Sequence, residues 1–212
     1  MLDPQRCAEI VAEIKALPWE RGRSVREHGK VKVTEELRAD RCEAVRPLLD
    51  EIARALDCDA IRNREHALRM YPPRFSRYAG NGEYKIHTDA AYMGGVRTDL
   101  ACTLFLTDDY EGGELVIEGV LPGDRPARVK APAGFAAVYE CWRPHWVEPV
   151  TAGERIVALT WMQSRVPDAE DRALLGLLNQ LIADIETPEL SAQERFAKLG
   201  AVHQKLLKRW SR

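Results

Sequence analysis

The sequence predicts a mainly β protein with flanking helices (α+β), and three observations favour this class. Helical periodicity occupies both ends of the 212-residue chain, and short strand-like runs separated by glycine and proline turns fill the middle. These runs follow one another too closely to leave room for crossover helices between parallel strands. We therefore expect antiparallel strands packed as a sandwich or jelly roll.

The N-terminal segment 1–60 is predicted to be a helical buttress for the β-region. Asp3 is a candidate N-cap with Pro4 in the first helical position, apolar residues then recur at helical spacing, and Pro18 stops the pattern. A short strand-like run covers 31–33, and a second amphipathic helix is expected at about 40–56.

The segment 61–166 is predicted to be the β-core. Pairs such as Gly94-Gly95, Gly112-Gly113 and Pro122-Gly123 punctuate it, as turns between strands do. The strand-like runs, in order, are LRMYPPRFSRY, EYKIHTD, TDLACTLFL, ELVIEG, ARVKA, FAAVYE and RIVALTWMQ.

The segment 167–212 is predicted to be a C-terminal helical extension, so that the three segments form one functional unit. Asp168 can cap the first helix, and Ser191 with Glu194 forms a capping box for the second. Each helix has an apolar stripe, which indicates either packing against the main domain or a homodimer interface.

Composition excludes several function classes. A formal net charge of -2 gives no electrostatic argument for nucleic acid or an anionic membrane surface. The chain has no run of apolar residues long enough to span a membrane, and MLDPQRCAEI lacks the layout of a signal peptide. Its five cysteines are scattered without a CxxC pair, which argues against a disulfide framework and a zinc knuckle. We expect a cytoplasmic protein.

The stretch YKIHTDAAYMGG, residues 84–95, carries the first chemical signal. In a strand, residues two apart project from the same face, so His87 and Asp89 converge if the strand extends that far. Together they supply two-thirds of a two-histidine, one-carboxylate iron site. The candidates for the third ligand are His28, His66, His145 and His203. His145 stands apart because it lies late in the β-region, where its strand can be the neighbour of the strand of His87.

Arg155 is the second signal, ten residues beyond His145 at the start of an apolar strand. A buried arginine is costly unless an anion pairs with it, and no acidic residue follows within that strand. A dicarboxylate ligand would supply the anion through a bidentate contact. In the alternative, Arg155 is solvated at the strand end or pairs with Glu154 or Asp99.

These residues resemble the signature of iron(II)/2-oxoglutarate-dependent dioxygenases, in which HxD is followed by a distant histidine and then a basic residue. The segments RFSRYAGNGEYKIHTDAA, RTDLACTLFLTDDYEGGELVI and PHWVEPVTAGERIVALTWMQS are similar to the PKHD-type hydroxylases of bacteria, relatives of the prolyl 4-hydroxylases. The resemblance covers roughly residues 70–166 and implies a double-stranded β-helix, a jelly roll that holds iron in one mouth.

By this resemblance, three residues bind Fe(II) and perform catalysis: His87, Asp89 and His145. It also implies that Arg155 binds the distal carboxylate of 2-oxoglutarate and that Tyr78 contacts this cosubstrate. A further tyrosine that assists the arginine in some relatives is replaced by Phe105, which leaves that helper unidentified. The family uses O2, and ascorbate commonly keeps its iron reduced.

The function implied is hydroxylation of a substrate C–H bond, with oxidative decarboxylation of 2-oxoglutarate to succinate and CO2. The substrate is open between a peptidyl prolyl or lysyl side chain, an amino acid and a small molecule. Two alternatives are a non-catalytic iron/2-oxoglutarate sensor and a cupin-like metalloenzyme that does not use 2-oxoglutarate. Arg155 argues against the cupin-like reading because such an enzyme has no dicarboxylate to anchor.

Overall fold

The computed structural model describes residues 2–22, 32–64, 66–119, 123–186 and 189–210. His28 and the first residue of the strand expected at 31–33 lie outside these ranges. The chain divides into two compact units, one made of Met1–Cys58 with Arg69–Gln163 and the other of Asp59–Leu68 with Ser164–Arg212. Among the described residues, no helix combines the length and the apolar character needed to cross a membrane.

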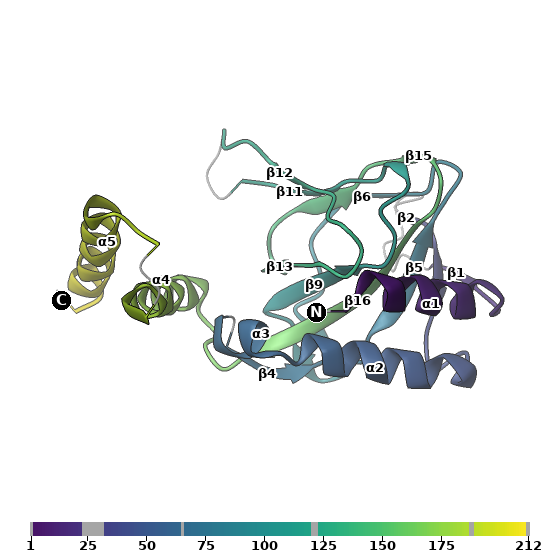
Figure 1. Cartoon of the computed structure of the whole chain (residues 1–212), viewed down its shortest axis with the longest axis horizontal. Coiled ribbons are helices and arrows are strands. Elements are labelled where there is room, and N and C mark those ends of the chain that lie inside the picture. The colour runs from purple at the N-terminus through teal and green to yellow at the C-terminus, as the bar shows by residue number, and fades with distance from the viewer. Residues whose placement is uncertain (1, 23–31, 65, 120–122, 187–188, 211–212) are drawn as a thin grey trace. The chain divides into compact units, whose positions relative to one another are not determined.

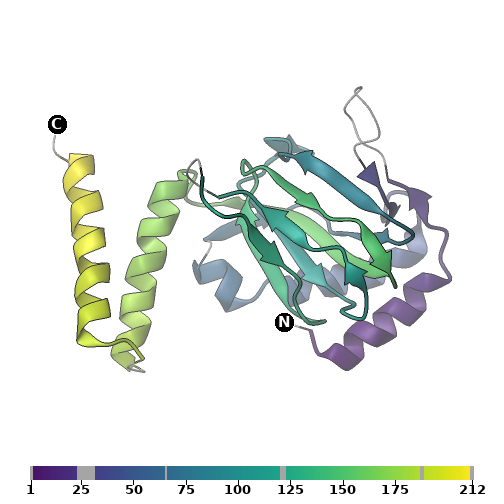
Figure 2. The same ribbon diagram turned by 90° about the horizontal axis from the view of Figure 1, so that it is seen from above.

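Two antiparallel sheets form the body of the first unit (Figures 1 and 2). The larger runs in the order β1-β3-β5-β16-β9-β13, with β4 also paired to β16. Its strands are β1 (Glu20–Arg21), β3 (Glu35–Leu37), β4 (Ala67–Met70), β5 (Arg74–Tyr78), β9 (Leu100–Phe105), β13 (Ala136–Glu140) and β16 (Arg155–Ser164). The smaller sheet runs β12-β11-β14-β6-β2. Its strands are β2 (Lys32–Val33), β6 (Glu83–His87), β11 (Leu115–Ile117), β12 (Ala127–Val129) and β14 (His145–Val147).

Two short ribbons complete the strands: β7 (Tyr92–Met93) with β8 (Val96–Arg97), and β10 (Glu111–Gly112) with β15 (Val150–Ala152). The two large sheets pack face to face, because the buried clusters between them draw residues from both. One cluster joins Tyr78 and Phe105 of the larger sheet to Val147 of the smaller. A second joins Trp161 and Tyr139 to Leu115. The predicted jelly-roll arrangement of antiparallel strands is therefore present.

The outer face of the larger sheet is covered by the helices α1 (Pro4–Lys15) and α2 (Arg46–Leu56) (Figures 1 and 2). Asp3 caps α1 as expected, since its Oδ1 accepts a hydrogen bond from the Gln5 backbone N–H at 2.8 Å. The guanidinium of Arg6 joins the two helices through two 2.8 Å hydrogen bonds to Glu51. Because the sheet is covered on both faces, β16 is almost continuously buried rather than alternating.

The second helix begins later than its apolar pattern suggested. A 3₁₀ turn, η1 (Glu43–Val45), precedes α2, which starts at Arg46. Pro47 stands in the first turn, where its missing N–H costs no helical hydrogen bond, so the regular helix begins there rather than near residue 40.

The second unit contains the helices α3 (Asp59–Arg64), α4 (Ala169–Glu186) and α5 (Ala192–Trp210). The Asp171 backbone N–H donates to Asp168 Oδ1 at 2.9 Å, and Ser191 forms its capping box with Glu194, both as expected. The helices α4 and α5 pack against each other, with a hydrogen bond of 2.7 Å from Lys198 to Gln180. Several apolar side chains of this hairpin remain exposed, including Ile185 and Phe196.

Candidate metal centre and its cavity

Strand pairing brings the two histidines together. The strands β6 and β14 are antiparallel neighbours, and His145 lies directly opposite His87 in their register. The two imidazole centroids are 4.2 Å apart, and both side chains are buried. Of the three histidine candidates within the described residues, His145 is the one that lies beside His87, as its late position in the β-region indicated.

Asp89 reaches the same point from a loop. The strand β6 ends at His87, so the expected extension of strand alternation to Asp89 is not what positions the carboxylate. Instead the Asp89 backbone N–H donates to the Cys141 carbonyl at 3.2 Å, which ties the loop to the end of β13. This contact leaves Asp89 Oδ2 3.7 Å from His145 Nε2.

Both imidazoles are held in the tautomer that a metal requires. His87 Nδ1 lies 2.8 Å from the Lys85 carbonyl, and His145 Nδ1 lies 2.9 Å from the Arg143 carbonyl. A carbonyl only accepts, so each Nδ1 carries the proton and each Nε2 carries the lone pair. Such backbone contacts fix both the ring orientation and the donor atom of metal-binding histidines.

The donor set fits Fe(II). One ligand atom from each of His87, Asp89 and His145 lies within 4.8 Å of the other two, and no other such group occurs in the described part of the chain. Asp89 Oδ2 is buried without a hydrogen-bond partner among the described residues, as expected of an atom that a cation would satisfy. Two imidazoles and one carboxylate leave further coordination positions free, which is the arrangement of non-haem Fe(II) oxygenases.

Arg155 is fully buried, with a relative exposure of 1%. Its Nε and Nη1 have no hydrogen-bond partner in the described ranges. The suggested partners are engaged elsewhere: Asp99 binds Arg97 through two 2.8 Å contacts, and Glu154 lies 3.0 Å from Lys15. The solvated and ion-paired alternatives for Arg155 are therefore wrong, and the guanidinium is available to an anionic ligand.

Aromatic rings hold the Arg155 guanidinium in place. Its Cζ lies 5.0 Å from the Tyr78 ring centroid and 5.4 Å from that of Phe105. These cation–π contacts orient the group without neutralising it. Gly113 makes the arrangement possible, because a Cβ at this position, where φ is +68°, would meet Arg155 Cδ and the Tyr110 ring at 3.1 Å each.

Tyr110 is a candidate that the sequence did not reveal. Its hydroxyl is buried without a hydrogen-bond partner in the described structure. Burial raises the pKa of Tyr110, and the nearby Arg155 guanidinium opposes that rise. The hydroxyl therefore stays protonated and can donate to the same anion as Arg155. Phe105 supplies only a ring, so Tyr110 is the candidate for the missing helper.

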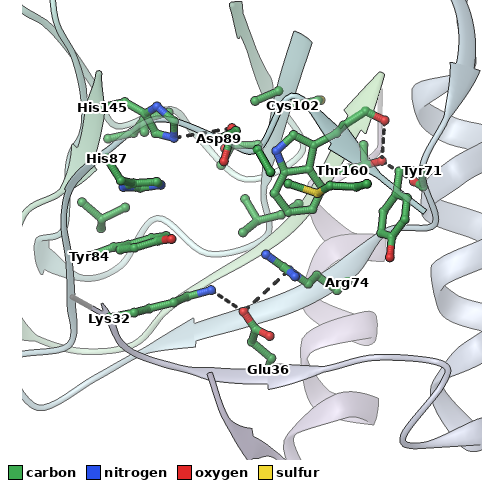
Figure 3. A pocket seen from close by; sticks show the side chains of 18 of the residues that line it. Lys32, Glu36, Tyr71, Arg74, Tyr84, His87, Asp89, Cys102, His145 and Thr160 are labelled. Carbon is green, nitrogen blue, oxygen red and sulfur yellow. Dashed lines mark hydrogen bonds and ion pairs between the residues drawn. The ribbon is translucent and has the colours of Figure 1, made fainter. Parts of the chain in front are cut away.

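The metal centre and Arg155 line one cavity of about 690 Å³, within the size range of small-molecule sites. Figure 3 shows the three side chains of the metal centre in this cavity. Tyr84 stacks on His87 with ring centroids 3.5 Å apart, and burial raises the pKa of Tyr84 to about 12, so it remains a neutral phenol. Trp161 also lines the cavity, as does a charged group of Lys32, Glu36 and Arg74. None of these three charged residues was expected at the site.

Comparison with known proteins places the chain in a family. Residues 73–163 match the family model of the 2OG-Fe(II) oxygenase superfamily. A PKHD-type hydroxylase of Sphingopyxis alaskensis is 41% identical over 150 residues, which amount to 68% of this chain and 66% of that relative. The chain thus spans about two-thirds of the length of this curated relative.

Two solved structures share the fold. A Pseudomonas putida prolyl-4-hydroxylase superposes with a TM-score of 0.55 at 19% identity, covering 78% of this chain and 89% of the other. A Trichoplax adhaerens prolyl hydroxylase, in complex with a hypoxia inducible factor oxygen degradation domain peptide fragment, gives a TM-score of 0.54 at 14% identity, covering 81% and 80%.

The chain belongs to the 2OG-Fe(II) oxygenase superfamily, and the curated relative it resembles is a PKHD-type hydroxylase. The expectation of a double-stranded β-helix is confirmed, since the sheets of this chain superpose on oxygenases of that fold. The family uses iron(II) and 2-oxoglutarate, for which the described residues supply a matching donor set and a buried arginine.

Replacing a ligand of the candidate metal centre should strongly weaken metal binding. We expect His87→Ala to weaken Fe(II) binding by at least about 100-fold, since only one histidine and one carboxylate would remain. Anaerobic titration calorimetry on the full chain measures this. The matched control is His203→Ala, which removes an exposed histidine of α5. Equal weakening in both variants would contradict the assignment.

Proposed function

We propose that the chain is an Fe(II)/2-oxoglutarate-dependent dioxygenase that hydroxylates a substrate C–H bond. In the overall reaction, 2-oxoglutarate and O2 become succinate and CO2, one oxygen atom entering succinate and the other the substrate. The observation that carries the proposal is the buried Arg155, whose Nε and Nη1 have no partner among the described residues, in the same cavity as the His87, Asp89 and His145 group.

Five residues of the cavity have a defined part in this proposal. His87, Asp89 and His145 bind the iron, which when bound supplies the site of O2 activation while 2-oxoglutarate supplies electrons. Arg155 binds the distal carboxylate of 2-oxoglutarate, with Tyr78 against the guanidinium. The burial of Arg155, His87 and His145 strengthens these charge-based contacts.

Arg155 argues against the first alternative function, and a turnover assay distinguishes the second from an enzyme. A cupin-like metalloenzyme without 2-oxoglutarate gives no reason for a fully buried arginine that lacks a carboxylate partner among the described residues. A non-catalytic sensor would keep both binding sites but form no succinate. Since all three candidate metal ligands are present, we favour the enzyme.

The proposals for the substrate, the reductant, the cellular location and the oligomeric state rest on the sequence, on a structural relative and on exposed apolar side chains. The Trichoplax adhaerens relative binds a peptide fragment, which keeps a prolyl or lysyl side chain among the candidate substrates, beside amino acids and small molecules. We further propose ascorbate as reductant, a cytoplasmic location, and a homodimer through the C-terminal helices, whose exposed Ile185 and Phe196 support that interface.

The proposal predicts succinate formation that depends on both sites. The Fe(II)-loaded full chain should convert 2-oxoglutarate slowly to succinate without added substrate, and His87→Ala should form none. Arg155→Gln should need at least about 30-fold more 2-oxoglutarate, because a buried charge pair is broken. An enzyme-coupled assay of succinate measures both the turnover and the 2-oxoglutarate requirement. Bound 2-oxoglutarate without turnover would favour the sensor, and no binding would contradict the role of Arg155.

Removing the Tyr110 hydroxyl should weaken the binding of 2-oxoglutarate. Tyr110→Phe should raise the concentration of 2-oxoglutarate required for half-maximal turnover about 10-fold, because a hydrogen bond to a buried carboxylate is lost. The maximal rate should stay within about twofold, since the reacting atoms are elsewhere. Tyr92→Phe, at an exposed tyrosine of β7, is the matched control. An unchanged requirement in Tyr110→Phe would remove Tyr110 from the cosubstrate site.

A further inference from the structure

Three charged side chains form a second polar group inside the cavity (Figure 3). Lys32 of β2 donates to Glu36 of β3, and the Arg74 Nε of β5 lies 3.6 Å from the same carboxylate oxygen. Their side chains are 2%, 8% and 19% exposed for Lys32, Glu36 and Arg74. A charged cluster this deeply buried is costly to maintain unless something satisfies it.

With two cations and one carboxylate, the cluster has an excess of one positive charge. Two cations share the Glu36 carboxylate, and Arg74 Nε has no hydrogen-bond partner among the described residues. Burial and the charge of Arg74 lower the pKa of Lys32, which Glu36 only partly opposes. An additional anion between the two cations would relieve their repulsion and satisfy the free N–H.

The rest of the cavity does not supply that anion. Of the lining cations, Arg21 and Arg41 are exposed, and Arg38 and Arg41 contact Asp40. The three remaining cations, Lys32, Arg74 and Arg155, lie in the cavity with two carboxylates, those of Glu36 and Asp89. Fe(II) and the dianion 2-oxoglutarate would cancel each other in charge, so one positive charge remains for a further anionic ligand.

The cluster lies beside the metal centre but apart from the Arg155 site. Lys32 Nζ is 5.0 Å from the Tyr84 ring centroid, and Tyr84 stacks on the ligand His87. Arg74 Cζ is 4.5 Å from the Trp161 ring centroid. Along β5, Arg74 is four residues from Tyr78, the cross-strand partner of Arg155, which corresponds to roughly 13 Å. The two guanidiniums therefore have different neighbours: Arg74 lies against Glu36 and Trp161, and Arg155 against Tyr78 and Phe105.

Tyr84 and Trp161 give the ligand a shape as well as a charge. Their rings flank the cluster and offer apolar surface for the carbon skeleton next to its anionic group. The cations lie within the cavity rather than on the exterior, so the anion must enter it. A single excess positive charge on the cluster matches a carboxylate better than a phosphate dianion.

We propose that Arg74 and Lys32, positioned by Glu36, bind a carboxylate of the substrate, which is a small carboxylic acid rather than an uncharged peptidyl side chain. This assignment rests on the proposed function, in which the same cavity holds Fe(II) and 2-oxoglutarate. It makes Arg74 a specificity-determining residue, since it selects the substrate without serving the cosubstrate.

The test compares acids with their own neutral amides. The full chain, loaded with Zn(II) and 2-oxoglutarate, is incubated with a mixture of N-acetyl amino acids, aromatic acids and aliphatic acids, each paired with its primary amide. Affinity selection with mass spectrometry identifies what is retained. We expect acids to be retained at least about 10-fold over their amides, and Arg74→Gln to weaken that binding at least about 30-fold.

Two further variants test the roles of charge and of position. Arg74→Lys should retain the preference for acids at reduced affinity, because it keeps the charge but loses the forked geometry. Arg77→Gln removes the same charge three residues along β5, from a side chain that contacts Glu35 and Trp19, and should leave acid binding unchanged. Thermal unfolding of every variant verifies the fold.

The proposal is overturned if amides are retained as well as acids, if no acid is retained, or if Arg74→Gln binds acids normally. It is also overturned if Arg74→Gln weakens 2-oxoglutarate binding as much as Arg155→Gln does, since Arg74 would then serve the cosubstrate. Failure of the proposed function is distinct, because the wild-type chain would then either not bind 2-oxoglutarate or bind it without forming succinate.

Discussion

The pairing of β6 with β14 is the constraint on which the candidate metal centre depends. This register sets His87 opposite His145, and a slip of one residue would turn one imidazole to the other face of the sheet. The pairing is irregular between these residues: Val147 pairs with Tyr84, so β6 uses one residue more than β14 over this stretch. Such a bulge lets Tyr84 and His87, three residues apart, both face the cavity.

The same irregular stretch orients the metal-binding atoms. The Lys85 carbonyl, which accepts from His87 Nδ1, lies within it, while Ile86 is left exposed. On the opposite strand, the Arg143 carbonyl just before β14 performs the same task for His145. Backbone carbonyls thus turn both Nε2 atoms toward the candidate metal position. Asp89 completes the group because its loop is anchored to Cys141.

Two buried groups of positive charge also line the cavity. Arg155 sits between the rings of Tyr78 and Phe105 at one site, and Arg74 and Lys32 share Glu36 at the other. A buried cation without a matching anion costs several kcal/mol, so each group indicates an anionic ligand that is present when the protein functions. A cosubstrate and a substrate that both carry carboxylates would account for two such groups in one cavity.

The sequence predicted the parts of this site whose signals are local or tied to fixed spacing. His87, Asp89, His145 and Arg155 stand in an ordered pattern, and the turns and helix caps follow from single residues such as Asp3 and Gly113. Tyr84 was not predicted, because strand alternation places residues three apart on opposite faces and only the bulge reverses this. Lys32 and Glu36 are only four residues apart, but Arg74 joins them through the pairing of β3 with the distant β5, which no local pattern records.

The central claim is that one cavity holds iron and 2-oxoglutarate in contact with each other. It is tested most directly by anaerobic titration of the Fe(II)-loaded full chain with 2-oxoglutarate, followed through the visible charge-transfer absorption that appears when a 2-oxo acid chelates Fe(II). We expect this absorption to saturate at one 2-oxoglutarate per chain and to be absent in Asp89→Ala. Binding of 2-oxoglutarate without the absorption would contradict it, because the two ligands would then occupy separate sites.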